Sequence, residues 1–369
     1  MDVKLNENSF VSHIQQSNTQ GWSLFYGKTG ELLFYSTIKN KGLVELMLSQ
    51  LQTSIENEEI GSYDFAYGLS GIFTALIDLD LLEPKEIAFF TKNLSNMILN
   101  LDDQYFLFDP FQGILGYFQL LRSTKTFSNE ILDFFITKLE NNKHSSGFYK
   151  ENTLHPKYKE YSEKISSHVS VNLGMAHGNI AILYWLYFFE KQPYRKNEFK
   201  KKRQELENYF INLIVITPDE NLIAAAIYSN GDSSEASLGW CYSELPLIYI
   251  LLSKGKLKKN NKTIVLNKIK DICNNFDRYL NQITEDFAFC HGVPGILYLL
   301  LKISVIHQMS EVQIIIDKLK SLVFSFDYHK TSDIGFLSGN VGLGLVLKSI
   351  ELNKFSDFWD KYLLIDCDE

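Results

Sequence analysis

The sequence lacks the cysteines, the signal segment and the long apolar runs that mark secreted and membrane proteins. Four cysteines in 369 residues are too few for a disulfide framework, which favours a reducing compartment. The first twenty residues have no basic start followed by an apolar core, so they do not form a secretory signal. Apolar runs end after about 10 to 12 residues, short of the ~20 needed to cross a bilayer. We therefore expect a soluble, cytoplasmic protein without an integral membrane segment.

The chain also lacks an excess of basic charge. It has 36 Lys and Arg residues against 44 Asp and Glu residues, a net charge of −8, so nucleic acid is not an expected partner. Two basic clusters, 195–203 and 254–262, are interpreted as solvated loops or helix ends. The 45% hydrophobic content is enough for a large core. Length alone suggests about two domains, but closed toroids and barrels of this size form single units.

What the chain does contain is one pattern repeated seven times. Each copy is a short turn, usually with two glycines three residues apart, followed by an apolar run. The turns open at positions 27, 68, 113, 178, 243, 292 and 339. The intervals between them are 41, 45, 65, 65, 49 and 47 residues, and each has room for two helices of ~10–14 residues. Two copies are degraded, because Ala181, Ser243 and Pro246 stand where glycine is expected.

Two kinds of helix should alternate along this repeat. The runs after the turns are apolar nearly all round, whereas stretches such as 84–99, 128–140 and 310–326 have apolar residues at three- and four-residue steps. An apolar helix must be surrounded by protein, and an amphipathic one can form a wall. An all-α, α/α toroid of about seven inner and seven outer helices meets both demands. An open solenoid is the alternative, but it requires polar capping repeats, and the last repeat is apolar.

The repeat covers the chain as one unit. We expect a single α/α-toroid domain over residues 1–369, with an N-terminal segment at 1–20. Polar stretches at about 141–167 and 190–204 are interpreted as surface inserts, with contact to a substrate as a further possibility. The glycine pairs should let the inner helices converge at their first turns. The residues next to these turns should then gather at one end, which is where chemistry is expected.

Soft metal ligands occur beside two of the turns. Cys241 lies two residues before position 243, and Cys290 and His291 directly precede Gly292. Two thiolates and an imidazole suit Zn²⁺ and leave a fourth position open, as in catalytic zinc sites. The alternative is that both cysteines are small buried hydrophobic residues. Zinc that already carries two thiolates is a poorer Lewis acid toward water, so an incoming thiol is the better match for it.

A histidine and two aspartates occupy the other turns. His177 immediately precedes Gly178 and is the natural general acid/base, with helix capping as the alternative. Asp109 stands four residues before Gly113, where it would orient the imidazole, accept a proton, or cap the helix. Asp64 has the same spacing from Gly68, and for it we favour the capping role.

Aromatic residues flank the first candidate zinc ligand. Trp240 and Tyr242 stand on either side of Cys241, and we assign them to substrate binding, with core packing as the equal alternative. Cys273 and Cys367 lie off the register of the turns, so we expect them to be buried or inert thiols.

The strings around these residues resemble those of the lanthionine synthetase C-like family, the lanthipeptide cyclases. The resemblance rests on AHGNIAIL, GWCYSEL, CHGVPGI and FLSGNVGLGLVL, with GLSGIFTAL earlier, and runs from about Gly27 to Ile350. It implies a sevenfold α/α toroid with zinc held by Cys241, Cys290 and His291. It also implies the Michael-type addition of a peptide cysteine to dehydroalanine or dehydrobutyrine, which forms a thioether ring, with His177 and Asp109 as acid/base residues.

The resemblance carries further expectations about partners. It implies a dehydrated precursor peptide as substrate, a separate dehydratase that prepares it, a membrane transporter, and a place in antibiotic biosynthesis in the cytoplasm. The chain departs from the family at Ser237, Ser243 and Pro246, where some or most members carry arginine, glycine and glycine.

Other functions remain open at this point. Protein prenyltransferases also use an α/α toroid and zinc to activate a peptide cysteine. A zinc-stabilised peptide-binding module without turnover is a second alternative. The eukaryotic branch of the resembled family, which joins glutathione to dehydrated proteins, is a third.

Overall fold

The computed structural model describes residues 5–17, 19, 21–102, 106–150, 169–217, 221–228, 233, 237–283, 285–331, 333–355 and 358–366. These residues are mainly helical. They group into two compact units, and we describe each by itself. Unit 1 is Met1–Leu81, Leu238–Trp240 and Cys273–Cys367, and unit 2 is Leu82–Ser237, Cys241–Ile272 and Asp368–Glu369. The single domain that we expected over 1–369 stays a prediction.

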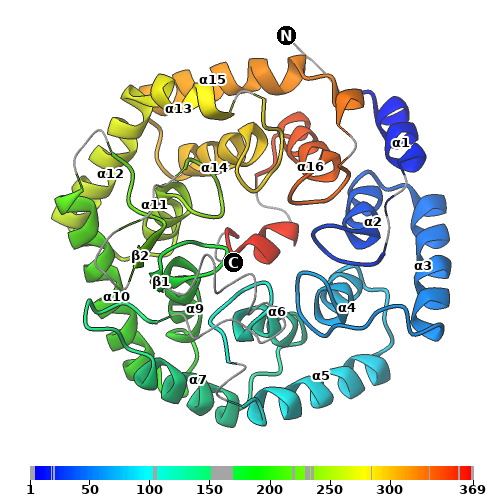
Figure 1. Ribbon diagram of the computed structural model, residues 1–369, viewed down its shortest axis with the longest axis horizontal. Helices are drawn as coiled ribbons and strands as arrows, with labels where there is room; N and C mark the ends of the chain where they lie inside the picture. Colours follow the sequence, from blue (N-terminus) through cyan, green and yellow to red (C-terminus); the bar gives the residue numbers. More distant parts are fainter. Residues whose placement is uncertain are drawn as a thin grey trace. The chain divides into compact units, whose positions relative to one another are not determined.

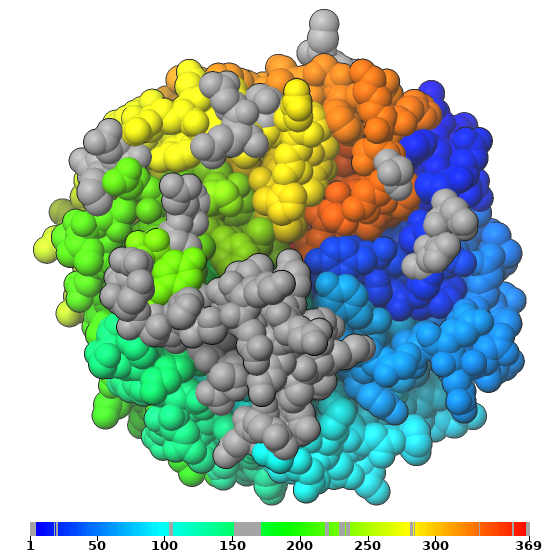
Figure 2. Space-filling model, in the orientation of Figure 1, coloured from blue at the N-terminus to red at the C-terminus, as the bar shows by residue number. Residues whose placement is uncertain are grey.

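Unit 1 alternates helices that are buried on most sides with helices that have one buried face. The buried helices are α2 (Lys28–Thr37), α4 (Leu69–Asp78), α14 (Val293–Ile306) and α16 (Asn340–Glu351). The others are α1 (Glu7–Gln16), α3 (Lys41–Glu56), α13 (Phe276–Ile283) and α15 (Ser310–Ser325). Two 3₁₀ helices complete the unit: η3 (Tyr328–Lys330), which has no buried residue, and η4 (Phe358–Leu363), which is mostly buried. Figure 1 shows α2 between α16 and α4, with α3 packed on it. In Figure 2 the blue N-terminal helices therefore lie beside the orange C-terminal ones.

Unit 2 follows the same alternation. Its buried helices are α6 (Ile114–Thr124), α9 (Asn179–Phe189) and α11 (Glu244–Ser253). The others are α5 (Pro84–Leu99), α7 (Asn129–Asn141), α10 (Lys196–Ile216) and most of α12 (Lys259–Asn274). The strands β1 (Val169–Asn172) and β2 (Ala226–Tyr228) form an antiparallel pair. Although several helices are apolar, none that the structure describes is long and apolar enough to cross a membrane.

The predicted positions of the buried helices are confirmed. Each begins at the residue that directly follows a turn-opening position, so the sequence repeat marks the helix starts in both units. The seven N-cap residues are Gly27, Gly68, Gly113, Gly178, Ser243, Gly292 and Gly339.

A loop carbonyl explains why these caps are glycines. In α6 the first helical amide, of Ile114, donates to the carbonyl oxygen of Leu107 at 3.1 Å and so gains the partner that the helix does not supply. A Cβ on Gly113 would stand 2.3 Å from that same oxygen. Five other turns share this geometry, with distances from 2.2 to 2.7 Å to the carbonyl six residues earlier. These are the turns at Gly27, Gly68, Gly178, Gly292 and Gly339.

The second glycine of a pair is needed for the same reason. A Cβ on Gly295 would lie 1.7 Å from the carbonyl oxygen of Phe289, again six residues earlier. The second glycines also lie close to a neighbouring turn, since a Cβ on Gly71 would stand 3.0 Å from Leu24 Cβ and one on Gly342 would stand 3.1 Å from Phe289 Cβ. The glycines therefore make room for the chain's own preceding loop as well as for the close approach of neighbouring turns that we expected. In the turn that lacks both glycines, a side chain caps the helix: Ser243 Oγ accepts a hydrogen bond from the Leu245 amide at 3.1 Å.

One of the two expected inserts lies mainly outside the described residues, and the other is mostly part of a helix. Most of the stretch at 141–167 falls outside them. The stretch at 190–204 is not an insert, since from residue 196 it forms the first half of α10. Its lysines follow the exposed side of that helix, while Phe199 and Arg203 are buried and Arg203 pairs with Glu207 at 2.7 Å. The many basic residues of this segment suggested a solvated insert, although the segment is the start of an amphipathic helix.

Replacing the second glycine of a turn should therefore destabilise the protein. We expect Gly295→Ala to lower the free energy of unfolding by about 2 kcal/mol or more, because the loop carbonyl must move. Gly42→Ala is the matched control: it lies in α3, and its nearest neighbouring atom would be 4.0 Å from the new Cβ. That change should raise stability by up to ~1 kcal/mol. Urea denaturation measures both, and equal effects would contradict the proposed crowding.

Candidate active site

His177 and Asp109 form a pair in unit 2. His177 Nδ1 lies 2.6 Å from Asp109 Oδ2, and the two side chains are 31% and 10% exposed. Because a carboxylate accepts hydrogen bonds, the imidazole carries its proton on Nδ1 in this arrangement. The other ring nitrogen, Nε2, is then the one that can exchange a proton with a ligand.

Asp109 performs two of the roles that the sequence left open. Its Oδ1 accepts hydrogen bonds from the amides of Phe111 at 2.6 Å and Gln112 at 2.9 Å, so it caps the turn before α6. Its Oδ2 meets the imidazole. The backbone amides of the turn thus fix the orientation of the Asp109 carboxylate, which in turn orients the imidazole of His177. Asp64 caps its own turn as expected, since its Oδ1 accepts from the Tyr67 amide at 2.6 Å.

Two aromatic rings contact the imidazole of His177. Phe111 meets it edge-on, with ring centroids 5.1 Å apart, and Tyr242 lies nearly parallel to it at 5.8 Å and 29°. The histidine is therefore only partly solvated. The assignment of Tyr242 to substrate binding stays a prediction.

Cys241 is tied to the loop that carries His177. It is a buried free cysteine, and its carbonyl oxygen accepts hydrogen bonds from the amides of Met175 at 2.9 Å and Ala176 at 3.2 Å. Gly174 permits this approach, because a Cβ there would stand 2.5 Å from the same oxygen. In unit 2 the segments that contain Cys241 and His177 are therefore joined by hydrogen bonds.

His291 in unit 1 has a carboxylate partner of its own. Its Nδ1 contacts Asp286 Oδ2, and its side chain is 49% exposed. Burial would raise the pKa of Asp286, but hydrogen bonds from His291 and from the Ala288 amide outweigh it, so that this pKa is lowered. A carboxylate on one ring nitrogen is the usual support of a metal-bound histidine, whose other nitrogen faces the metal.

The segment 238–240 lies directly against Cys290 and His291 in unit 1. The Trp240 amide donates to the Cys290 carbonyl oxygen at 2.7 Å. Gly239 allows this, because a Cβ there would stand 2.7 Å from the Cα of His291. The residue that precedes Cys241 in the chain is therefore hydrogen-bonded to Cys290, which is itself a partly exposed free cysteine.

The position of Trp240 favours core packing, the alternative to substrate binding that the sequence left open. Its side chain is 0% exposed, and its indole Nε1–H donates to the Leu363 carbonyl oxygen at 2.7 Å. The accepting helix η4 is itself anchored, since buried Asp360 contacts Lys302 and accepts from Tyr298 at 2.7 Å. Trp240 is thus a core residue that attaches the segment before Cys241 to the C-terminal part of unit 1.

The metal site stays a prediction. The boundary between the units falls between Trp240 and Cys241, so Cys241 belongs to unit 2 whereas Cys290 and His291 belong to unit 1. Within the described ranges, no three His, Cys, Asp or Glu side chains gather into a metal-binding group. The fourth cysteine, Cys367, lies outside those ranges. Cys273 is buried, and burial raises the pKa of its thiol to about 12, as expected for an inert residue.

Sequence reasoning missed three residues that support the site. Asp286, Gly174 and Gly239 each hold or admit a candidate functional residue. A signal for Asp286 was present: like Asp333, it stands six residues before the turn-opening glycine and caps its turn through Oδ1. The two glycines have no such local signal, because the chains that approach them come from distant parts of the sequence.

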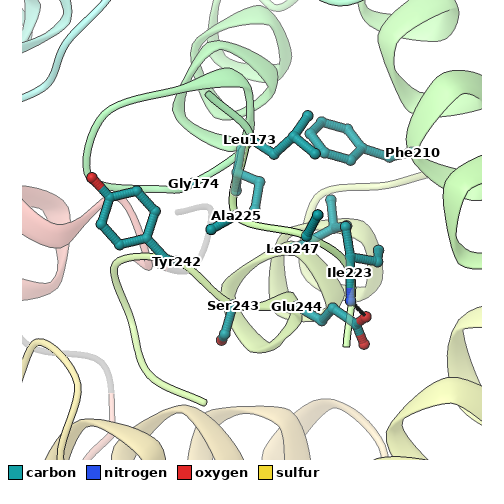
Figure 3. Close-up of a pocket in the computed structure, with 11 residues that line it drawn as sticks. Leu173, Gly174, Phe210, Ile223, Ala225, Tyr242, Ser243, Glu244 and Leu247 are labelled. Atoms are coloured by element: carbon teal, nitrogen blue, oxygen red, sulfur yellow. Dashed lines mark hydrogen bonds between the residues drawn. The ribbon is translucent and has the colours of Figure 1, made fainter. Parts of the chain in front are cut away.

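A small cavity of unit 2 lies behind Tyr242. Its volume is about 10 Å³, roughly the room for the centre of one water molecule. Figure 3 shows Glu244 at its edge, with its carboxylate joined to the Ile223 amide. Glu244 is 1% exposed, and its Oε1 lies 3.7 Å from Lys268 Nζ. Burial raises the pKa of Glu244 to about 7, although Lys268 and the Ile223 amide lower it in part.

Comparison with known proteins identifies the family. The model of the family described as "Lanthionine synthetase C-like protein" matches residues 82–364, so the chain belongs to this family. Among solved structures the chain is similar to one titled "Nisin cyclase", with a TM-score of 0.71, 17% sequence identity and 97% of both chains covered. This likeness confirms the all-α, α/α-toroid fold class. No functionally curated protein sequence matches the chain.

The raised pKa of Glu244 predicts a pH dependence of stability. The folded state holds this proton more tightly than the unfolded state, so the stabilisation is complete below pH ~4.5 and is lost as the pH rises through about 7. We expect Glu244→Gln to reduce the loss of unfolding free energy between pH 5 and pH 8 by about 1–3 kcal/mol. Urea denaturation at both pH values measures this, and a parallel pH dependence of variant and wild type would contradict it.

Proposed function

We propose that the protein is a zinc-dependent lanthipeptide cyclase. It adds cysteine thiols of a peptide to dehydroalanine or dehydrobutyrine residues of the same peptide, which forms lanthionine or methyllanthionine rings. Family membership supports the class of reaction. The observation that carries the proposal is the 2.6 Å contact of His177 with Asp109, because an addition to a double bond requires a residue that moves one proton.

The reaction balances as an addition without a leaving group. The substrate sulfur bonds to the β-carbon, and the thiol proton ends on the α-carbon. Asp109 holds the His177 proton on Nδ1 and stabilises the charged ring when it forms. Nε2 of His177 is then the atom that takes a proton and returns it to the α-carbon. Phe111 and Tyr242, which contact the imidazole, limit access of water to this step.

The donors for the metal are Cys241, Cys290 and His291. Their chemistry fits Zn²⁺, and the contact of Asp286 with His291 Nδ1 fits a histidine that turns Nε2 to a metal. A zinc ion held by these residues would lower the pKa of a substrate thiol and so favour the thiolate form.

The proposed reaction defines the partners. The substrate is a peptide with free cysteines and α,β-unsaturated residues, so a dehydration step must precede the reaction, and we propose a separate dehydratase for it. A cytoplasmic location, export of the product by a membrane transporter and a role in antibiotic biosynthesis complete the proposal. The support for these three is the family to which the chain belongs.

Loss of the imidazole should slow cyclisation without loss of metal. We expect His177→Ala to lower kcat by about 10²–10⁴-fold, since general acid/base catalysis contributes this much. Asp109→Asn should also lower kcat, because the amide no longer fixes the ring. The assay follows loss of alkylatable thiols in a dehydrated peptide by mass spectrometry. His329→Ala, at an exposed histidine of η3, is the control that should retain wild-type kcat.

The metal is tested independently of activity. Wild-type protein should contain about one zinc per chain, as the donor count predicts, and Cys290→Ala should lose it. Cys273→Ala is the matched control with unchanged zinc content, because that thiol is buried away from the turns. Elemental analysis of purified protein gives the ratio. Full-length wild-type protein that binds no zinc would exclude the proposed mechanism.

A further inference from the structure

One position of the repeat recurs in every turn as an outward-facing residue. It is the residue that immediately precedes the turn-opening position, and it is half-buried or exposed in all seven turns although the next residue is buried. Three of these residues are already assigned to the proposed site: His177, Tyr242 and His291. The complete set is Tyr26, Tyr67, Gln112, His177, Tyr242, His291 and Ser338.

In unit 1 a series of backbone hydrogen bonds aligns four of the turns. The Cys290 amide donates to Leu337 at 3.0 Å, the Leu337 amide donates to Phe25 at 3.1 Å, and the Phe25 amide donates to Ala66 at 3.5 Å. Each of these residues lies two before a turn-opening glycine. The four turns are therefore held side by side in one register.

The outward-facing residues follow this alignment. His291, Ser338, Tyr26 and Tyr67 each come directly after a residue of the bonded series, so they succeed one another in that order. Gly335 confirms the neighbourhood, because a Cβ there would stand 3.0 Å from Ser338 Oγ and 3.2 Å from Tyr26 Cα. The candidate metal ligand His291 and the two tyrosines thus belong to one row within unit 1.

Tyr26 and Tyr67 form a stacked aromatic pair at the end of this row. Their ring centroids are 5.1 Å apart, their planes differ by 9°, and the two residues are 37% and 44% exposed. The Tyr67 backbone is fixed, since its amide donates to Asp64. Such a pair offers a flat apolar surface together with two hydroxyl groups, which suits a planar, unsaturated peptide segment.

We propose that the Tyr26–Tyr67 pair is a binding surface for the substrate peptide, next to the part that reacts. It contacts residues flanking the reacting cysteine, through stacking of planar dehydrated residues or amides and hydrogen bonds to peptide carbonyls. The tyrosines position the peptide and take no part in the addition. The proposal rests on the proposed function, because it names where that reaction's substrate lies.

The test is a double variant with two matched controls. Tyr26→Ala combined with Tyr67→Ala should raise KM for cyclisation of a dehydrated, cysteine-containing peptide about tenfold, with kcat and zinc content unchanged. It should weaken binding of the fluorescently labelled peptide, measured by anisotropy, by the same factor. Tyr63→Ala removes a tyrosine that is 56% exposed but stands off the register, and it should change neither value. The Tyr26→Phe, Tyr67→Phe protein, which keeps the stack, should retain most of the affinity.

The outcomes separate this proposal from the proposed function. If wild-type protein cyclises the peptide and KM is the same in the double variant, the binding surface is excluded while the cyclase stands. If wild-type protein binds the peptide in a tyrosine-dependent way without cyclising it, the surface stands and the cyclase does not. A dimer of this chain that the double variant dissociates would assign the pair to self-association and overturn the proposal. If the alanine protein does not fold, equal peptide binding by the phenylalanine protein and by Tyr26→Leu, Tyr67→Leu protein would overturn it as well.

Discussion

A single carbonyl oxygen in most turns governs how this chain folds. In the turn before α6 the Leu107 oxygen accepts the first helical amide, that of Ile114, and lies where the Cβ of any residue other than Gly113 would be. A helix start without such a partner would leave its amide unsatisfied. The glycine is therefore the condition for the cap, and the cap fixes the path of the loop. The candidate functional residues lie in these loops, so their positions depend on this interaction.

The same element appears once in each unit: a carboxylate that contacts Nδ1 of an imidazole. Asp109 holds His177, and Asp286 holds His291. Each aspartate also caps its own turn through the other oxygen, so its position is set by the backbone before it meets the histidine. The surroundings of the two pairs differ: Phe111 contacts the imidazole of His177, whereas the side chain of His291 is half exposed.

Much of the fold could be predicted from the sequence, because the pattern that specifies it is local. Turn-opening residues, apolar runs and three- and four-residue periodicities lie within one helix or one loop, and the seven helix starts follow from them. The basic start of α10 was misassigned because composition was given more weight than periodicity. Only part of the reason for the glycine pairs was evident from the sequence, since the carbonyl oxygen that also requires them belongs to a loop whose path cannot be read from the sequence.

By itself the sequence determined the all-α class, the helix starts and the residue types beside the turns, including His177, Cys241, Cys290 and His291. Tertiary structure alone decided which of these residues meet. Asp109 and His177 are 68 positions apart, and Trp240 and Leu363 are 123 apart, so their contacts depend on how whole helices pack. The packing buries the side chain of Trp240 and stacks the ring of Tyr26 on that of Tyr67. The sequence repeat shows which positions are equivalent, but which residues contact each other depends on how the helices pack.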